Sequence, residues 1–266
     1  MYTFGFIGTG NMGSAMMRGC IAAGMAGQVA CFDKDVVKGQ AVSVETGVPF
    51  LESVSECVSL SKFVILAVKP QVYPAVLEQI RPQMNEERIL ISLAPSYTIA
   101  DIKACLGERI RIIRVMPNTP ARVGEGMTGI CFSEDEFTGE EKQLAKEFFE
   151  SFGRCETVPE NLMGAVTAAS GSSPAFIYMM IEALADGVVA CGMPRAQAYT
   201  FVAQSVLGSA KMVLETGQHP GVLKDEVCSP GGTTIAGVAA LEAGGFRSSL
   251  IDAVLAVEAK CHPDKK

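Results

Sequence analysis

Residues 3–13 read Thr-Phe-Gly-Phe-Ile-Gly-Thr-Gly-Asn-Met-Gly, and this stretch decides the fold. A short apolar run leads into a G-x-G-x-x-G pattern at Gly8, Gly10 and Gly13, and residues 14–17 can continue as a helix. The sequence therefore predicts a strand, a tight glycine turn and a helix. Such a turn leaves room for a pyrophosphate, and the helix N-terminus presents free N–H groups to it.

The composition excludes several classes of protein. The chain has 266 residues, of which 48% are hydrophobic, and a net charge of −7 with no basic stripe, so we expect no nucleic-acid or membrane-surface partner. Nine cysteines without a C-x-x-C pattern predict reduced thiols in the cytoplasm, and we expect no signal peptide. The two histidines, His219 and His262, lie far apart, so we expect no metal site.

Residues 161–181 carry no charge and are long enough to span a membrane. They nevertheless contain one asparagine, four serine or threonine side chains and a proline, which is too polar a set for lipid. We therefore expect a helix that protein buries on nearly all sides, with a second subunit as the covering partner.

The fold class follows from the alternation of apolar runs and helical patterns up to residue 158. Strands are predicted at 29–33, 48–50, 63–68, 89–93, 111–116, 124–130 and 155–158, and helices at 36–45, 53–60 and 140–151. Continuous apolar runs are typical of parallel strands buried on both faces, so we predict an α/β, Rossmann-like, mostly parallel sheet.

The pattern changes near residue 160, where the strand signals end. Helices are predicted at 162–192 (interrupted near 171–174), 195–215, 222–227, 233–243 and 246–260. We therefore expect a dinucleotide-binding domain at 1–160 and an all-helical domain at 161–266.

The ends of the predicted strands supply candidate cofactor residues. Asp33 ends the second strand, where an acid binds the adenine ribose hydroxyls of NAD, whereas Lys34 could bind the 2′-phosphate of NADP. Asp33 could instead only start a turn or cap the next helix. The Lys69-Pro70 pair could likewise form only a strand-to-helix turn.

A second candidate anion site lies at residues 228–237, Cys-Ser-Pro-Gly-Gly-Thr-Thr-Ile-Ala-Gly. The glycine turn opens a helix and offers N–H groups at Gly232, Thr233 and Thr234 together with the hydroxyls of Ser229 and both threonines. This set suits a small carboxylate. An ordinary helix cap would show the same pattern.

The same stretch resembles a known family. Residues 222–242 match the signature of the pyrroline-5-carboxylate reductases: a Leu-Lys-Asp lead-in, Cys-Ser-Pro-Gly-Gly-x-Thr, Gly-Val and Leu-Glu. Other motifs of that family recur at 5–12, 67–70, 116–120, 170–175 and 218–221. The clearest departure is Ser173, where many members have glycine.

The resemblance implies reduction of Δ1-pyrroline-5-carboxylate to L-proline with NADPH or NADH, the last step of proline synthesis. It implies interlocked homodimers, which often assemble further into decamers, and a small-molecule substrate. It implies a threonine near the substrate nitrogen, Thr167, and a carboxylate site at Ser229, Gly232, Thr233 and Thr234. The implied cofactor residues are Gly8, Thr9, Gly10, Asn11, Met12, Asp33, Lys34, Ala67, Lys69, Pro70, Ala94 and Asn118.

Two other functions fit the sequence less well than the reductase. A β-hydroxyacid dehydrogenase needs a lysine on the first helices of its second domain, but the chain has no lysine between Lys146 and Lys211. A non-catalytic dinucleotide sensor would not need the second anion site at residues 229–234.

Overall fold

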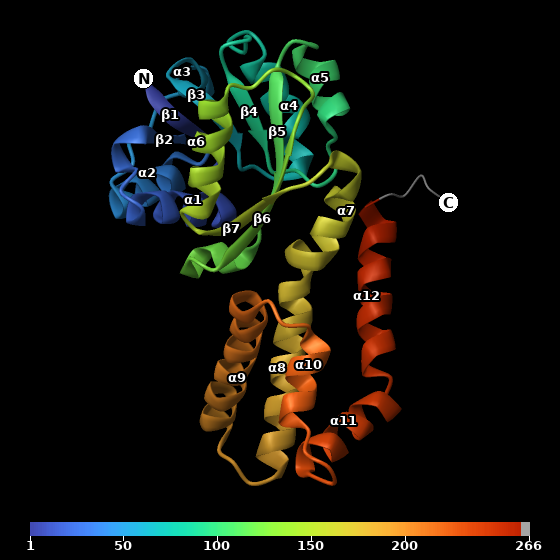
Figure 1. Cartoon of the computed structure of the whole chain (residues 1–266). Coiled ribbons are helices and arrows are strands. Elements are labelled where there is room, and N and C mark those ends of the chain that lie inside the picture. Colours follow the sequence, from blue (N-terminus) through green and yellow to red (C-terminus); the bar gives the residue numbers. More distant parts are fainter. Residues whose placement is uncertain (262–266) are drawn as a thin grey trace. The chain divides into compact units, whose positions relative to one another are not determined.

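The computed structural model describes residues 1–261 and divides them into two compact units. The first unit comprises Met1–Ser172 together with the segment that begins at Val257, and it contains the β-sheet. The second unit, Ser173–Ala256, consists of helices (Figure 1). The predicted domain division at residue 160 stays a prediction.

A seven-stranded sheet forms the centre of the first unit. Its strands are β1 (Tyr2–Ile7), β2 (Val29–Phe32), β3 (Ser61–Leu66), β4 (Ile89–Ser92), β5 (Arg111–Met116), β6 (Gly126–Phe132) and β7 (Gly153–Thr157). The strand order is β2-β1-β3-β4-β5-β6-β7, and every neighbouring pair is parallel except β5 with β6. The predicted Rossmann-like, mostly parallel sheet is confirmed. Its order reverses between β1 and β3, which is where such sheets bind ligands.

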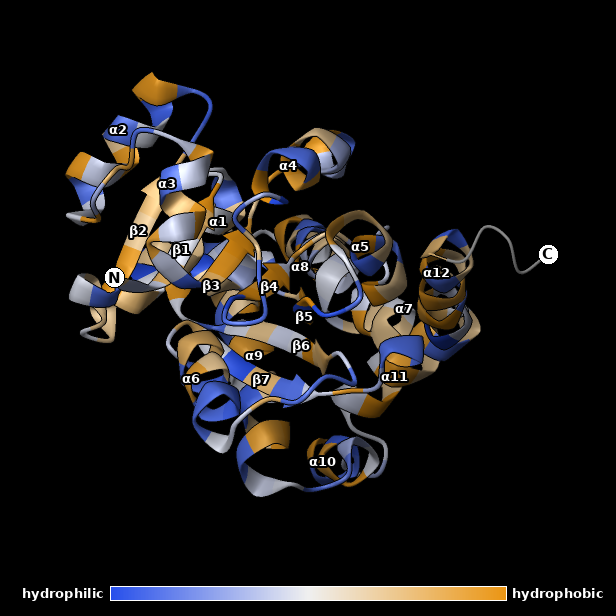
Figure 2. Ribbon diagram, turned by 90° about the horizontal axis from the view of Figure 1, so that it is seen from above, coloured by the Kyte–Doolittle hydropathy of each residue, from blue (hydrophilic) through white to orange (hydrophobic). Residues whose placement is uncertain are grey.

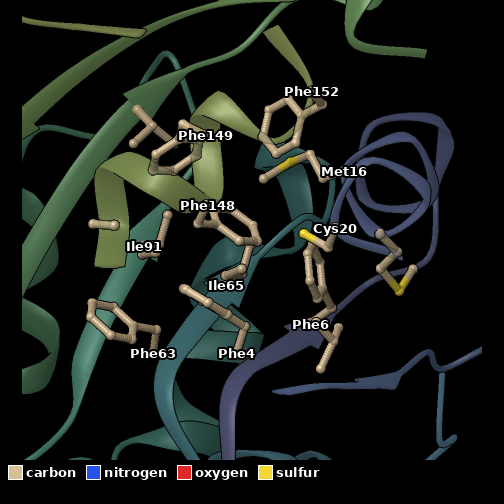
Figure 3. Close-up of a cluster of buried hydrophobic side chains, with 14 of the residues drawn as sticks. Phe4, Phe6, Met16, Cys20, Phe63, Ile65, Ile91, Phe148, Phe149 and Phe152 are labelled. Atoms are coloured by element: carbon tan, nitrogen blue, oxygen red, sulfur yellow. The ribbon is translucent and has the colours of Figure 1, made fainter. Parts of the chain in front are cut away.

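Helices cover both faces of this sheet. One face packs against α1 (Asn11–Ala22), α2 (Val36–Thr46) and α6 (Gly139–Glu150), and the other against α3 (Val54–Ser59), α4 (Tyr73–Ile80) and α5 (Ile99–Leu106). On the first face the rings of Phe4 and Phe148 stack with centroids 4.3 Å apart (Figure 3). Alternate residues of each central strand enter opposite cores, which explains the continuous apolar runs in the sequence.

Residues 48–50 do not form the predicted strand. A single parallel bridge joins Phe50 to Cys31, with Cys31 N–H donating to the Pro49 carbonyl at 2.9 Å. Proline has no N–H to donate, so the pairing with β2 stops after one bridge.

The helix predicted at 162–192 is not interrupted at 171–174. It runs through α7 (Met163–Val166), a π-helical stretch at Thr167–Ser172 and α8 (Ser173–Ala190). Because Pro174 lacks an N–H, an α-helical bond to the carbonyl of Ser170 is impossible. The Asn118 amide donates to that carbonyl at 3.1 Å instead. The helix is therefore locally widened into a π-turn rather than broken.

The second unit contains α8, α9 (Arg195–Thr216), α10 (Pro220–Val227), α11 (Thr233–Ala243) and most of α12 (Phe246–Cys261). Helices α8 and α9 pack through Ala185, Ala198 and Val202. No residue of α10, α11 or the described α12 is buried within one chain, although hydrophobic residues stand on α10 and α12 (Figure 2).

The helical stretch Glu160–Ala190 is long and apolar enough to cross a membrane, with a mean hydropathy of 1.3. Only 6% of its most apolar window is buried within one chain, so the burial predicted for residues 161–181 does not come from the chain itself. Large side chains on α8, α9 and α12, among them Tyr178, Met179, Phe201 and Leu255, are exposed as well. A hydrophobic surface of this extent is typical of an interaction surface.

Candidate functional site

The glycine loop after β1 lies directly against the end of β3. Gly8 has φ +106°, and a Cβ at this position would lie 2.6 Å from the carbonyl oxygen of Ala67. The Gly8 N–H donates to the Phe32 carbonyl at 2.8 Å, which joins the loop to the end of β2 as well. Only glycine combines this backbone conformation with so close an approach. Gly8 and Ala67, both predicted to belong to the site, are thus brought together.

Gly10 leaves the N-terminus of α1 open. It is the N-cap residue, no side chain caps the helix, and no acidic residue occupies its first turn. A Cβ at Gly10 would meet no described atom within 4 Å. The first N–H groups of α1, which belong to Asn11 and Met12 among others, therefore face a space that an anion can fill. This open end fits the pyrophosphate predicted from the sequence.

Asp33 is tied to the same loop. Its Oδ2 accepts from the N–H of Thr9 at 2.6 Å and from the Thr9 hydroxyl at 2.8 Å, and its Oδ1 accepts from the N–H of Asp35 at 2.9 Å. Burial raises the pKa of Asp33, but these hydrogen bonds and the charge of Lys38 outweigh it and hold the pKa below its usual value. Asp35, not Asp33, caps α2, so the alternative role of Asp33 as the helix cap is wrong.

The remaining predicted cofactor residues follow strands β3, β4 and β5. Ala94 is buried, Lys69 is exposed, and Pro70 opens a short 3₁₀ turn. The sequence did not identify Tyr73, whose hydroxyl donates to the Leu66 carbonyl at 3.0 Å and accepts from the N–H of Leu93 at 3.1 Å. Burial raises the pKa of Tyr73 to about 12. The neutral phenol thus joins the carboxyl ends of β3 and β4, a link that no local sequence pattern indicates.

Asn118 connects the end of β5 to the π-helical stretch that begins at Thr167. Its Oδ1 accepts from the N–H of Met127 at 2.9 Å, and its Nδ2 donates to the Ser170 carbonyl. Thr167 itself donates its hydroxyl proton to the Met163 carbonyl at 2.8 Å. The lone pairs of Thr167 Oγ1 can accept a hydrogen bond from another group. π-Bulges of this kind are frequent at functional sites.

A second set of residues that the sequence did not identify holds the loop after β4. Arg114, on β5, donates to Glu160 at 2.9 Å and to the Pro95 carbonyl at 2.7 Å. Glu160 also accepts from the N–H of Ile99, the first residue of α5, at 2.7 Å. The Arg114 side chain is only 9% exposed. Because 46 residues separate Arg114 from Glu160, the pairing leaves no pattern in the sequence.

The predicted carboxylate site forms a turn at the start of α11, in the second unit. Gly231 has φ +67°, and Gly232 is the N-cap of a helix with no capping side chain and no acid in its first turn. The Gly232 N–H donates to the Ser229 carbonyl at 3.0 Å, so the prediction that this N–H is free is wrong. The N–H groups of Thr233 and Thr234 lie in the first turn of the helix, where N–H groups have no partner within the helix.

The turn at residues 229–234 is packed closely at Gly232. A Cβ there would lie 2.3 Å from Ser229 Oγ, so the serine hydroxyl lies directly over the N-cap residue. Ser229, Thr233 and Thr234 are exposed in the single chain. Hydroxyls and helix N–H groups together can hold a small carboxylate.

Two family models match the chain. Residues 160–263 match the model described as pyrroline-5-carboxylate reductase dimerisation, and residues 3–96 match the model described as NADP oxidoreductase, coenzyme F420-dependent. The first range includes all of α7 to α11, where hydrophobic side chains are exposed in the single chain.

Known proteins resemble this chain over nearly its whole length. The pyrroline-5-carboxylate reductase of Escherichia coli (strain K12) is 45% identical over 94% of this chain and 93% of its own length. A solved pyrroline-5-carboxylate reductase from Coxiella burnetii superposes with a TM-score of 0.92 at 32% identity, covering 100% of this chain and 99% of the other. A Plasmodium falciparum pyrroline carboxylate reductase solved with NADP bound gives 0.87 at 31% identity, with coverage of 98% and 97%.

Proposed function

This chain belongs to the pyrroline-5-carboxylate reductase family and is an NAD(P)H-dependent oxidoreductase that reduces Δ1-pyrroline-5-carboxylate to L-proline, and we propose that two open helix N-termini divide this reaction between them. The N-terminus of α1 receives the cofactor pyrophosphate at residues 8–12. The N-terminus of α11 receives the substrate carboxylate. The observation that carries this assignment is that each helix starts at a glycine N-cap with no side chain capping it.

The chain's own residues mainly position the reactants. Asp33 or Lys34 meets the adenosine side of the cofactor, and the residues proposed for the nicotinamide half are Ala67, Lys69, Pro70, Ala94 and Asn118. The bound nicotinamide supplies the hydride. Holding the imine carbon in reach of that hydride is the larger part of the task, because orientation alone contributes several kcal/mol to lowering a barrier.

The experiment that tests this function is oxidation of L-proline or thiazolidine-4-carboxylate at high pH, measured separately with NAD and NADP. We expect at least one of the two cofactors to be reduced. The absorbance of the reduced nicotinamide measures this reaction. Absence of turnover with both cofactors, together with no reduction of Δ1-pyrroline-5-carboxylate in the forward direction, would refute the proposed function.

We propose that Thr234 contributes its hydroxyl and N–H to the carboxylate. Removing a hydrogen bond to a charged group costs about 1.5–3 kcal/mol, so Thr234→Ala should raise the apparent KM for the carboxylate substrate roughly 10- to 100-fold. The Kd for the cofactor should not change. Thr200→Ala serves as the control, because Thr200 is also exposed and its hydroxyl donates to the Ala196 carbonyl of its own helix. An unchanged substrate affinity in Thr234→Ala would remove this turn from the site.

We propose that Thr167 stabilises the protonated imine. Its hydroxyl proton is bound to the Met163 carbonyl, so Oγ1 can accept the N–H of the iminium ion that receives hydride. Thr167→Val should lower kcat about 10-fold or more, since a hydrogen bond from a charged donor is lost. Ser170→Ala is a matched control, because Ser170 makes the same backbone bond to Val166 at 3.0 Å. Full turnover by Thr167→Val would exclude this role.

The helical region is a dimerisation region, and this indicates a homo-oligomer. We propose that two chains interlock through α8 to α12, that the dimers assemble further into a decamer, and that the enzyme acts in the cytoplasm. The exposed apolar side chains of these helices support the dimer. Light scattering should give a mass that is an even multiple of 28.1 kDa, whereas a monomer would contradict the proposal.

A further inference from the structure

We infer that this chain selects NADH over NADPH, and that Asp33 is the residue that makes the selection. The inference rests on the proposed function only in placing a nicotinamide dinucleotide on the glycine loop. The charged groups at the end of β2 are Asp33, Lys34, Asp35 and Lys38. Cofactor selection depends on which of these groups lies nearest to the ribose 2′ position.

Asp33 lies where the adenine ribose must pass. Its Oδ2 holds both the N–H and the hydroxyl of Thr9, and Thr9 stands between the two glycines that leave room for the pyrophosphate. The ribose is the next group along the cofactor, so it comes within reach of the same carboxylate. Lys34 and Lys38, in contrast, are exposed.

The carboxylate is fixed in place. Three hydrogen bonds, two from Thr9 and one from Asp35, hold it. Helix α2 also packs against it, because a Cβ at Gly39 would lie 3.1 Å from the Asp33 Cβ. Asp33 therefore cannot turn away from an incoming phosphate without breaking its contacts to the glycine loop.

The remaining capacity of Asp33 suits a hydroxyl and not a phosphate. A carboxylate has about four acceptor sites, of which three are occupied, so one site on Oδ1 remains for the 2′-hydroxyl of NADH. A phosphate monoester offers little hydrogen to donate at pH 7 and brings a charge of about −1.5 to −2. Hydrogen bonds hold the pKa of Asp33 below its usual value, so the repelling charge is present at neutral pH.

The two lysines offset only part of this repulsion, although the charge of Lys38 contributes to the lowered pKa of Asp33. Exposed charges are screened by water and salt, and long side chains lose entropy when they are held in one place. The N-terminus of α2 does not help either, because the Asp35 carboxylate already accepts from the N–H of Lys38 at 3.1 Å and caps the helix. Unlike the open end of α1, this helix end carries an acid and disfavours a second anion.

The test measures cofactor binding without the carboxylate substrate. Titration of the wild-type enzyme with NADH and NADPH, followed by nicotinamide fluorescence, should show NADH binding at least about tenfold more tightly, a difference of about 1.4 kcal/mol. ADP-ribose and 2′-phospho-ADP-ribose, as probes without the nicotinamide, should show the same preference. NADPH binding as tightly as NADH, or more tightly, would overturn the inference even if no variant could be purified.

Variants identify the residue responsible. Asp33→Ser should shift the ratio of the two Kd values toward NADPH by about tenfold or more. Asp35→Asn removes the same charge two residues away and keeps an oxygen to cap α2, and it should shift the ratio less than about threefold. If Lys34 bound the 2′-phosphate instead, Lys34→Ala would weaken NADPH binding selectively; that result, or an unchanged ratio in Asp33→Ser, would contradict the assignment.

The outcomes separate this inference from the proposed function. An enzyme that prefers NADH in binding but does not reduce the imine would refute the function and leave the inference standing. An enzyme that reduces the imine but binds NADPH more tightly would refute only the inference.

Discussion

Gly10→Ala is expected to weaken binding of the dinucleotide about 100-fold or more, which corresponds to roughly 2.7 kcal/mol, while the free energy of unfolding changes by no more than about 1 kcal/mol. The protein itself has room for the added methyl group, because no described atom lies within 4 Å of a Cβ at Gly10. The backbone has φ −62° there, which alanine adopts without strain. The methyl group would instead occupy space that the pyrophosphate needs in order to reach the N–H groups of α1.

Two other glycines make this experiment specific. Gly27→Ala is the control, since a Cβ at Gly27 also meets no described atom within 4 Å but lies in the short turn Ala26–Gln28. It should leave both binding and stability unchanged. Gly8→Ala should lose both, because of its φ of +106° and the contact with the Ala67 carbonyl. Calorimetric titration and thermal unfolding measure the two effects. Wild-type affinity in Gly10→Ala would show that the cofactor does not bind at this loop.

Glu160→Gln is expected to lower the free energy of unfolding by about 2–3 kcal/mol. The substitution removes the ion pair of the Arg114 guanidinium, whose side chain is only 9% exposed, and breaking a buried ion pair is strongly destabilising. We expect less than the 3–5 kcal/mol typical of fully buried pairs, because the Glu160 side chain is 33% exposed. The loss should appear in chemical denaturation as a lower midpoint with an unchanged slope.

The matched control is the ion pair of Arg109 and Glu86, whose charged atoms lie 3.0 Å apart. Their side chains are 85% and 63% exposed. Glu86→Gln should cost no more than about 0.5 kcal/mol, since surface pairs contribute little. Arg114→Met combined with Glu160→Gln should cost less than the sum of the single changes, because the double variant leaves no buried charge unpaired. Equal effects of Glu160→Gln and Glu86→Gln would contradict the structural role assigned to Arg114.

The sequence predicted the features that depend on local backbone requirements. Apolar runs indicated β1, β3, β4 and, interrupted by Arg114, β5, because a parallel strand covered on both faces has apolar residues at successive positions. The glycine pattern at 8–13 and the glycine pair at 231–232 predicted the turns that open α1 and α11, because Gly8 and Gly231 have the positive φ that favours glycine. Family motifs supplied the function, because they recur at fixed spacings along the chain.

Where the sequence misled, the reason was a backbone or tertiary partner. Pro49 limited a predicted strand to one bridge, and Asn118 accompanied a π-turn where Pro174 suggested a break. The apolar helix at 161–181 is predicted to be covered by a second subunit; the single chain buries little of it, and the covering partner stays a prediction. Hydropathy predicts that a surface is buried, but it does not identify the chain that covers this surface.

By itself the sequence determined the sheet, the glycine loop and the family, because each of these follows from short motifs whose own residues lie close together along the chain. Only the tertiary structure decided that Thr9 fixes Asp33, that Tyr73 joins the ends of two strands and that Arg114 pairs with Glu160. Those contacts join side chains across separate elements, where hydrogen-bond geometry and burial select the partner. No periodicity records them, because the distance between two side chains in space is independent of their separation in the sequence.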